Sequence, residues 1–212
     1  NILDFENLTE ENIYVLESPI LSNHQFKKFS DFFKKNIKIL DSTFNIEENL
    51  KDRLNKICLE SEIAVREGAK HLILSDKNID EKRVQIPMIL AVGAINSRLT
   101  NLGIRGFASI NVETSEALDT HSFAVLLGVG ATTINPYIAF DSIYQRYEKK
   151  LFGKLNFEEC VNRYIKSIDK GLLKIMSKMG ISVLSAYRGG CNFEAVGLSR
   201  ALVARYFPGM VS

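Results

Sequence analysis

The sequence predicts an α/β protein built from about five parallel β/α units, arranged either as an open sheet or as an incomplete (degenerate) TIM-barrel-like structure. Short apolar runs of strand length alternate about five times with longer segments of helical periodicity. Parallel strands need such crossover connections, so the alternation favours a parallel sheet. Five units are too few for a regular eight-stranded barrel, while 212 residues suffice for one sizeable domain.

An irregular lead-in of about 35 residues precedes the predicted β/α core, which covers about 36–200 of a single domain, 1–212. The clearest feature of the lead-in is a short helix marked by aromatic residues near helical spacing, at Phe26, Phe29, Phe32 and Phe33. Pro19 favours an extended approach to this helix, and Ser22 or Asn23 can cap its first turn.

The elements of the core follow from the apolar pattern and from glycine and proline near the helix ends. Strands are expected at 37–40, 71–74, 108–112, 131–134 and 181–184, and helices at 50–65, 87–103, 116–127, 136–147 and 157–179. Gly68 and Gly180 stand where helices end, because glycine readily adopts the left-handed conformation common after the last turn. Pro87 suits the first turn of the second core helix.

Two of these helices carry predicted caps at their starts. Asn135 and Pro136 would supply the N-cap and the first-turn residue of the helix at 136–147. Asn156 with Glu159 resembles a capping box, with asparagine in place of the usual serine or threonine. No internal repeat and no low-complexity linker interrupts the pattern.

The composition is that of a globular protein, with 46% hydrophobic residues, 25% charged residues and a net charge of +2. No concentrated basic face is visible, so no nucleic-acid partner is expected. No apolar run approaches the ~20 residues that span a bilayer. The acidic segment 1–11 lacks the basic and apolar regions of a signal peptide, so a cytoplasmic protein without a membrane partner is predicted.

The sequence shows no pattern for a metal or a bound cofactor. The three cysteines, Cys58, Cys160 and Cys191, are far apart, no CxxC occurs, and the three histidines are scattered. The glycine pair in 128–130 lacks the third glycine of a dinucleotide-binding loop and precedes a strand instead of a helix. We therefore assign no catalytic, cofactor-binding or metal-binding residue.

Several predicted strands end at polar residues, namely Asp41, Asp76, Glu113 and Asn135. Ligands of parallel α/β folds bind at the carboxyl ends of the strands, so these side chains could converge on a site. The same residue types also cap turns and helices without any chemistry. One alternative function is therefore a free-standing barrel-like enzyme that uses Asp76, Glu113 and Arg188 around a small ligand such as an anion.

The segment 174–198 concentrates polar residues that the core pattern leaves unexplained. Tyr187 and Arg188 precede a glycine pair, where they could bind an anion or dock against another domain, and Lys178 is a further possible contact. Lysines recur every four residues along the long helix, at Lys166, Lys170, Lys174 and Lys178. Such a stripe is typical of a solvated face. A third possible function is a regulatory or assembly module whose lysine stripe binds an acidic partner.

Several blocks of the chain resemble, in order, the central domain of the large (α) subunit of glutamate synthase. They are "ESPILSN" (17–23), "AVREGAKHLILSD" (64–76), "IPMILAVGAI" (86–95), "VETSEA" (112–117), "HSFAVLLGVGATTINPYIA" (121–139) and "KGLLKIMSKMGIS" (170–182), followed by "AYRGG" and "FEAVGLS". The resemblance covers roughly residues 14–207 and is specific, because several independent blocks keep the order of the family.

The resemblance implies a parent enzyme that makes two glutamates from glutamine, 2-oxoglutarate and a reductant. In this family an amidotransferase domain releases ammonia, which travels through an internal tunnel to a barrel that carries FMN and a [3Fe-4S] cluster. The central domain, a degenerate relative of that barrel, lies between the two. The resemblance therefore implies a non-catalytic linking domain without its own cofactor. The two neighbouring domains are absent from this stretch, and the parent enzyme takes electrons from a small NADPH-oxidising subunit or from ferredoxin.

The resemblance also singles out Ser22 and Asn23, which match the hydroxyl and the asparagine that begin the family's central domain at the entrance of the ammonia tunnel. A hydroxyl and an amide can exchange hydrogen bonds with ammonia without trapping it as a charge would. The alternative is that both residues only cap a helix. At 96–98, and at Cys191, the chain departs from the family's usual histidines and glutamine, which argues against catalytic or cluster-binding roles there.

Overall fold

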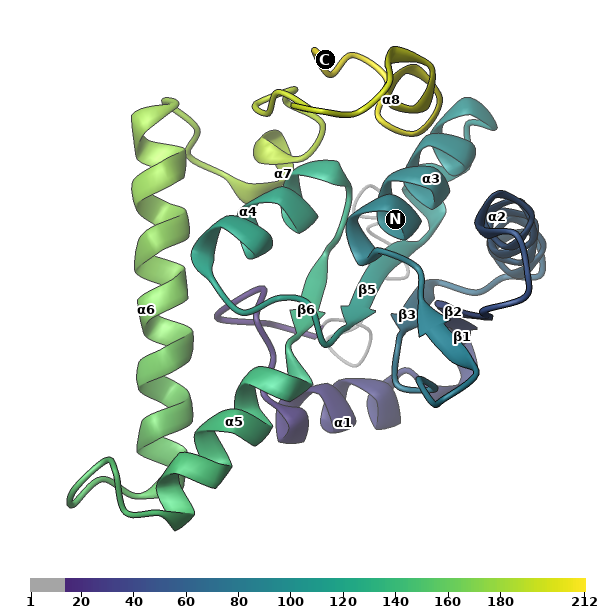
Figure 1. Cartoon of the computed structure of the whole chain (residues 1–212). Helices are drawn as coiled ribbons and strands as arrows, with labels where there is room; N and C mark the ends of the chain where they lie inside the picture. The colour runs from purple at the N-terminus through teal and green to yellow at the C-terminus, as the bar shows by residue number, and fades with distance from the viewer. Residues whose placement is uncertain (1–13) are drawn as a thin grey trace, which may run out of the picture.

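The structure, a computed structural model, describes residues 14–212, and a parallel sheet of four strands lies at its centre (Figure 1). The strand order is β1-β3-β5-β6. The strands are β1 (Ile37–Asp41), β3 (His71–Ser75), β5 (Ser109–Glu113) and β6 (Thr133–Asn135). The predicted α/β class is confirmed, and of the two predicted arrangements the open sheet is the one observed.

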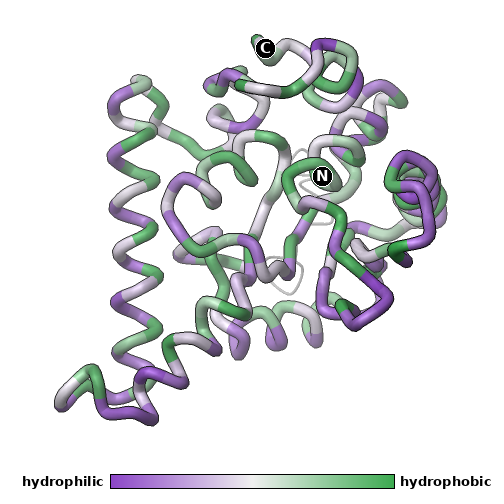
Figure 2. The backbone as a smooth tube through the Cα atoms, viewed as in Figure 1, coloured by the Kyte–Doolittle hydropathy of each residue, from purple (hydrophilic) through white to green (hydrophobic). Residues whose placement is uncertain are grey.

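Helices connect and cover these strands. They are α1 (Asn23–Phe32), α2 (Leu50–Arg66), α3 (Met88–Asn101), α4 (Thr120–Val129), α5 (Tyr137–Glu148), α6 (Phe157–Lys178), α7 (Leu184–Tyr187) and α8 (Arg200–Tyr206), with short 3-10 turns η2 (Lys34–Asn36) and η3 (Arg105–Phe107). Neighbouring helices pack in the order α2, α3, α4, α6 and α5, and α8 packs on α3. Figure 2 shows α6 alternating between hydrophilic and hydrophobic residues along its length, as expected for a helix with one buried face.

The two faces of the sheet bury different side chains, because successive residues of a strand point to opposite sides. On one face Leu72 and its register partner Ile110 join the main core with residues of α2, α3 and α4. On the other face Ile73 packs with Phe26 and Phe29 of α1. Strand β3 is therefore covered on both faces, which explains its continuous apolar sequence.

The predicted fifth strand at 181–184 is wrong. The free edge of β6 is already occupied by the lead-in, since Ile20 forms a parallel bridge with Ile134. The backbone N–H of Leu21 donates to Ile134 O at 2.9 Å, and Ile134 N–H donates to Pro19 O at 2.8 Å. A strand following α6 in sequence has no free edge there, and Leu184–Tyr187 instead forms the short helix α7, which contacts α4.

Most predicted helix starts are confirmed, and two need correction. Asn156 and Glu159 form the predicted capping box of α6. Asn135 is not a cap, because it is the last residue of β6 and α5 follows Pro136 without a side-chain cap. The helix expected from 116 begins four residues later, because the Asp119 carboxylate accepts the Ser122 N–H at 2.8 Å and fixes the N-cap there.

A two-stranded antiparallel pair, β2 (Thr43–Asn45) and β4 (Arg83–Gln85), lies beside the end of β1 and was not predicted. Strands of three residues are too short to show a period of two in the sequence. The pair continues from β1, since Ser42 N–H donates to Ser75 O at 2.8 Å and Ile86 N–H donates to Ser42 O at 2.8 Å.

Candidate functional site

The carboxyl ends of the four strands place a row of polar side chains at one edge of the sheet. The register pairs Asp41 with Ser75, Ser75 with Glu113, and Glu113 with Asn135. Asp76 follows directly after β3. The prediction that the polar strand ends lie at the same edge is therefore confirmed, and this row, with the loops that follow it, is called the carboxyl edge below.

The Asp76 side chain is fully buried at this edge, where its carboxylate accepts hydrogen bonds from two neighbouring residues. Its Oδ2 accepts from Thr114 Oγ1 at 2.8 Å, from Ser115 N at 2.9 Å and from Ser115 Oγ at 3.1 Å. A buried carboxylate needs such donors to offset its lost hydration. Asp76 thus fixes the loop between β5 and α4 and presents no free oxygen toward solvent.

Glu113 is paired in the same way. It accepts from Ser75 Oγ at 2.7 Å and from the Lys77 ammonium at 2.6 Å. The Lys77 ammonium also lies 5.1 Å from the ring centroid of Tyr137, within the range of a cation–π contact. Burial and then the neighbouring Asp76 carboxylate raise the pKa of Tyr137, so its hydroxyl stays protonated at neutral pH.

A third carboxylate, Glu116, closes the start of α3 by accepting from the backbone N–H of Met88. This contact places a carboxylate at the positive end of the helix. Burial raises the pKa of Glu116, and the nearby Asp76 charge acts in the same direction. Its contact with α3 makes it a structural cap.

Ser22 and Asn23 lie at the carboxyl edge as well, beside Asn135. The Asn135 amide, 1% exposed, donates to Leu21 O and to Asn23 Oδ1, both at 2.9 Å. Ser22 is the N-cap of α1: its Oγ accepts from Gln25 N at 3.2 Å, and its own N–H donates to Gln25 Oε1 at 2.9 Å. Ser22 is therefore the residue that caps α1, whereas the side chain of the exposed Asn23 contacts Asn135 at the end of β6.

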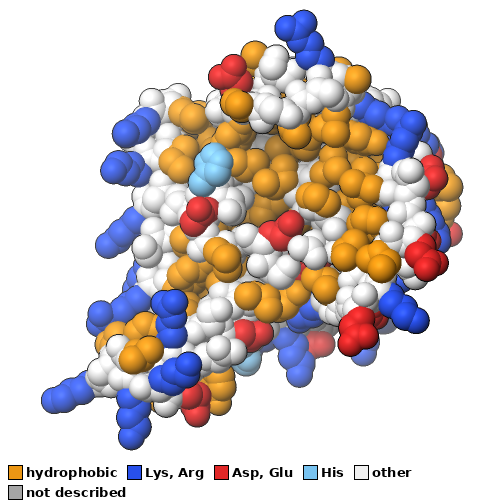
Figure 3. Space-filling view, in the orientation of Figure 1, with side chains coloured by type: hydrophobic (Ala, Val, Ile, Leu, Met, Phe, Trp, Pro, Cys, Tyr) orange, Lys and Arg blue, Asp and Glu red, His pale blue; other side chains and the backbone are white. Residues whose placement is uncertain are grey.

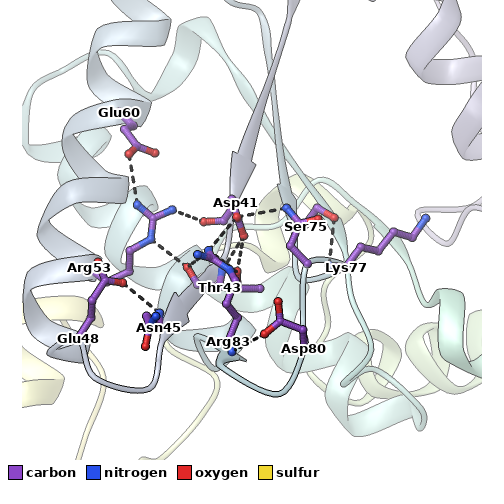
Figure 4. A network of polar contacts seen from close by, with 11 residues as sticks. Asp41, Thr43, Asn45, Glu48, Arg53, Glu60, Ser75, Lys77, Asp80 and Arg83 are labelled. Carbon is purple, nitrogen blue, oxygen red and sulfur yellow. Dashed lines mark hydrogen bonds and ion pairs between the residues drawn. The ribbon is translucent and has the colours of Figure 1, made fainter.

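At the β1 end of the same edge, Asp41 belongs to a second polar network (Figure 4). Its carboxylate accepts from Thr43 Oγ1 at 2.7 Å, from Asn78 Nδ2 at 3.2 Å and from Arg83 Nη2 at 3.0 Å. Burial acts to raise the pKa of Asp41, but these hydrogen bonds and the Arg83 charge outweigh it and hold the pKa below its ordinary value. The network joins β1 to the β2–β4 pair.

A pocket of about 580 Å³ opens beside this network, lined in part by Asp41, Arg53, Glu60 and Arg83. Arg53, almost fully buried, donates from Nε to Thr43 O at 3.0 Å and from Nη1 to Glu60 at 3.2 Å (Figure 4). Two pairs of the lining charges are thus joined to each other, Arg53 with Glu60 and Arg83 with Asp41, and these contacts tie α2 and β1 to the β2–β4 pair.

The structure does not bring together the three residues of the alternative enzyme hypothesis. Asp76 and Glu113 lie at the carboxyl edge, whereas Arg188 lines a different pocket with Lys70 and Ser109, which stand at the amino ends of β3 and β5. The two carboxylates are also engaged with their own donors. This geometry offers no common ligand position for the three side chains.

The other residues named from the segment 174–198 lie apart from one another. Tyr187 is 1% exposed, and its ring meets the ring of Phe193 edge-on, with centroids 6.1 Å apart. Lys178 ends α6 and is exposed, like the other three lysines of the stripe. Figure 3 shows basic side chains projecting along the edge where α6 lies, and within residues 14–212 none of the four lysines forms an ion pair. They form a solvated face.

Among the described residues, neither the cysteines nor the glycines at 128–130 form a cofactor-binding arrangement. No group of three His, Cys, Asp or Glu side chains in 14–212 is placed to hold a metal ion. Cys160 is buried on α6 and Cys191 is exposed, while burial raises the pKa of the Cys58 thiol on α2 to about 11. The glycines at 128–130 close the carboxyl end of α4, where carbonyl groups rather than N–H groups are free. We derive no step through FMN or an iron–sulfur cluster on this stretch.

Sequence reasoning missed Lys77, Ser115 and Tyr137, which complete the carboxyl edge. The signal was present, since each of the three carries a hydrogen-bond donor and lies one or two residues after a polar strand end that was predicted. It also missed the contact between Asn23 and Asn135, which are 112 residues apart. No local sequence pattern indicates a contact between residues this far apart.

Within the part of the chain that the structure describes, no helix combines the length and apolar character needed to cross a membrane.

Comparison with known proteins identifies related chains. Residues 1–199 match the family "Glutamate synthase central domain". The chain is 51% identical over 215 residues to the glutamate synthase [NADPH] large chain of Azospirillum brasilense, covering 100% of this chain and 14% of that protein. It is 41% identical to the corresponding Bacillus subtilis large chain, covering 93% and 13%, and 38% identical to the ferredoxin-dependent glutamate synthase of Pyropia yezoensis, covering 100% and 15%. The chain thus spans only about one seventh of the length of these relatives.

Proposed function

Since the chain belongs to the glutamate synthase central domain family, we propose that residues 1–212 act as one domain inside a longer glutamate synthase chain. The domain links the amidotransferase domain to the barrel that carries FMN and a [3Fe-4S] cluster. The parent enzyme converts glutamine, 2-oxoglutarate and a reductant into two glutamates. The relatives named above include both NADPH and ferredoxin forms, and either reductant is compatible with this segment. The proposed compartment is the cytoplasm, where cysteines such as Cys58 stay reduced.

A linking role is supported by the surface of the domain. Figure 3 shows hydrophobic side chains gathered over the region of α3 and α4, surrounded by polar and charged groups. Leu118, just before α4, is 55% exposed. Large apolar areas of this kind are typical of surfaces that meet another domain.

The observation that carries a role in the ammonia path is the pairing of Asn23 with Asn135 at the carboxyl edge. The Asn135 amide donates to the oxygen of the Asn23 side chain, and the nitrogen of this exposed Asn23 amide has no acceptor within residues 14–212. Ser22, beside it, is fixed by the capping box of α1. Together they form a neutral wall of hydroxyl and amide groups, held in place from two elements.

The charges nearby are arranged so that they do not compete for ammonia. Asp76 is saturated by donors and Glu113 is paired with the Lys77 ammonium. An unpaired carboxylate would favour ammonium, which has no lone pair with which to attack a keto carbon. The neutral pair at the edge thus suits passage of uncharged ammonia.

The test places Asn23→Ala and Asn23→Asp in the complete enzyme and compares glutamine hydrolysed with glutamate formed from 2-oxoglutarate. We expect hydrolysis to outrun synthesis, with the ratio rising by up to about five-fold for Asn23→Ala, the factor that corresponds to one hydrogen bond of about 1 kcal/mol. Asn23→Asp still accepts from Asn135, so its structure is preserved while its added charge loosens the coupling further.

The matched control is Gln25→Ala, which removes half of the capping box and leaves Ser22 and Asn23 in place. It should lower stability slightly and keep the wild-type ratio of the two activities. If both Asn23 variants also keep that ratio, the tunnel role is wrong and the segment serves only to start α1.

A further inference from the structure

A second pocket, of about 710 Å³, opens at the opposite end of the sheet from the carboxyl edge. Lys70, His71 and Ser109, which line it, stand at the amino ends of β3 and β5, and Arg105 and Arg188 enter it from η3 and from the loop after α7. Among residues 14–212, no aspartate or glutamate lines this pocket. It is therefore basic, polar and separate from the site discussed above.

Within residues 14–212, Arg105 is held in a fixed orientation by neutral acceptors. Its Nε donates to Asn96 Oδ1 at 2.7 Å, Nη1 donates to Ala108 O at 2.6 Å, and Nη2 donates to Gly130 O at 2.8 Å. The three acceptors lie on α3, just before β5 and just after α4. The guanidinium is thus positioned rigidly, yet within residues 14–212 no carboxylate balances its charge.

Arg188 brings a second positive charge to the same pocket, and no ion pair joins it to a carboxylate of the described residues. Its Nε is buried and has no hydrogen-bond partner among the described residues. Burial, followed by the charge of Arg188, lowers the pKa of Arg105 to about 10. Two like charges in a partly desolvated pocket are unfavourable unless an anion joins them.

We propose that this pocket binds an oxyanion, a carboxylate or a phosphate group, between Arg105 and Arg188. Guanidinium groups bind such oxygens with short, charge-assisted hydrogen bonds, and the unpartnered Arg188 Nε supplies a donor that no protein acceptor in 14–212 uses. The Ser109 hydroxyl, 2.7 Å from His71 Nδ1, lines the same pocket as a further polar group. The oxyanion comes either from solution or from an Asp or Glu side chain in another part of a longer chain.

The experiment uses the complete enzyme, with inorganic phosphate as the probe and calorimetric titration at constant ionic strength. Arg188→Gln removes the charge of a side chain that holds no other hydrogen bond among the described residues, so the fold should tolerate it. Arg66→Gln is the matched control, because Arg66 is exposed on α2 and pairs with Glu62 at 2.9 Å. We expect phosphate binding that weakens at least ten-fold in Arg188→Gln and stays unchanged in Arg66→Gln.

A second arm identifies a carboxylate supplied by the chain itself. In the Arg188→Lys variant, carbodiimide coupling joins the new amine to any carboxylate that occupies the pocket, and peptide mass spectrometry locates that residue. Coupling to an Asp or Glu outside residues 1–212 supports the proposal with the other part of the chain as the source. The proposal is overturned if Arg188→Gln leaves phosphate binding unchanged and Arg188→Lys couples to no carboxylate.

Discussion

The buried carboxylate of Asp76 is expected to be among the most important single side chains for the stability of this domain. Asp76→Ala should lower the free energy of unfolding by about 3–4 kcal/mol. Asp76→Asn, which keeps the size of the side chain, should lower it by about 1–2 kcal/mol. The difference between the two variants separates the loss of hydrogen bonds from the loss of charge.

These magnitudes follow from the donors that Asp76 satisfies. Thr114 Oγ1 and Ser115 N donate to it at 2.8 and 2.9 Å, and Thr114 is fully buried. A hydrogen bond to a charged group contributes roughly 1.5–3 kcal/mol, so two at the low end give about 3 kcal/mol. The Ser115 hydroxyl is partly exposed and can turn to water. Asparagine keeps one oxygen for Ser115 N, and the Thr114 hydroxyl can turn to accept from its amide.

Urea unfolding of the 212-residue chain, followed by circular dichroism, measures these free energies. Asp31→Asn is the control, because Asp31 is exposed on α1, and we expect it to stay within about 0.5 kcal/mol of the wild type. If Asp76→Ala also stays within about 1 kcal/mol, the donors find other acceptors and the reasoning is refuted.

Two further outcomes are expected. Burial, with the charge of Lys70, lowers the pKa of His71 from 6.5 to about 4, so the unfolded chain binds more protons between these values and stability falls as the pH drops through them. Because His71 is partly exposed, the loss should amount to only about 1–2 kcal/mol. Urea unfolding at several pH values should show it, and His71→Gln should remove it; a variant that keeps the slope would contradict this assignment. Gly128→Ala places a Cβ 2.4 Å from a ring carbon of Phe193 and should lower stability by about 1–3 kcal/mol in thermal unfolding, whereas Gly106→Ala, with nothing within 4 Å, should not. Equal effects of the two alanines would mean that the ring moves freely.

The sequence was informative wherever one segment determines its own structure. The four parallel strands and the long helices appear in the apolar pattern because each buries a face with a regular period. The polar row at the carboxyl edge could be predicted from Asp41, Glu113 and Asn135, since parallel strands end at the same side. That geometry needs no knowledge of the loops.

The wrong strand prediction and the missed contacts have one physical cause. The prediction of a fifth strand was wrong because Ile20 occupies the edge of β6, and no residue near 181–184 indicates that contact. The same is true of the candidate site, where Asn23 meets Asn135 across 112 residues. Arg188 was named from the sequence as a possible anion contact, but Arg105 was missed, because the two arginines come from elements that only the tertiary structure brings together. Patterns in a single sequence describe local structure, and each of these features depends on long-range packing.

The pairing of Pro19–Leu21 with β6 also affects how the chain is made. The lead-in leaves the ribosome early, but its partner Ile134 is synthesised 114 residues later than Ile20. At about 5–20 residues per second, the segment waits roughly 6–23 s for that strand, whereas Phe26 and Phe29 of α1 need only the earlier strand β3, whose Ile73 they contact. During translation this region is an exposed apolar segment of the kind that chaperones bind. Contacts of such sequence separation also slow folding, so the edge of the sheet should be completed late.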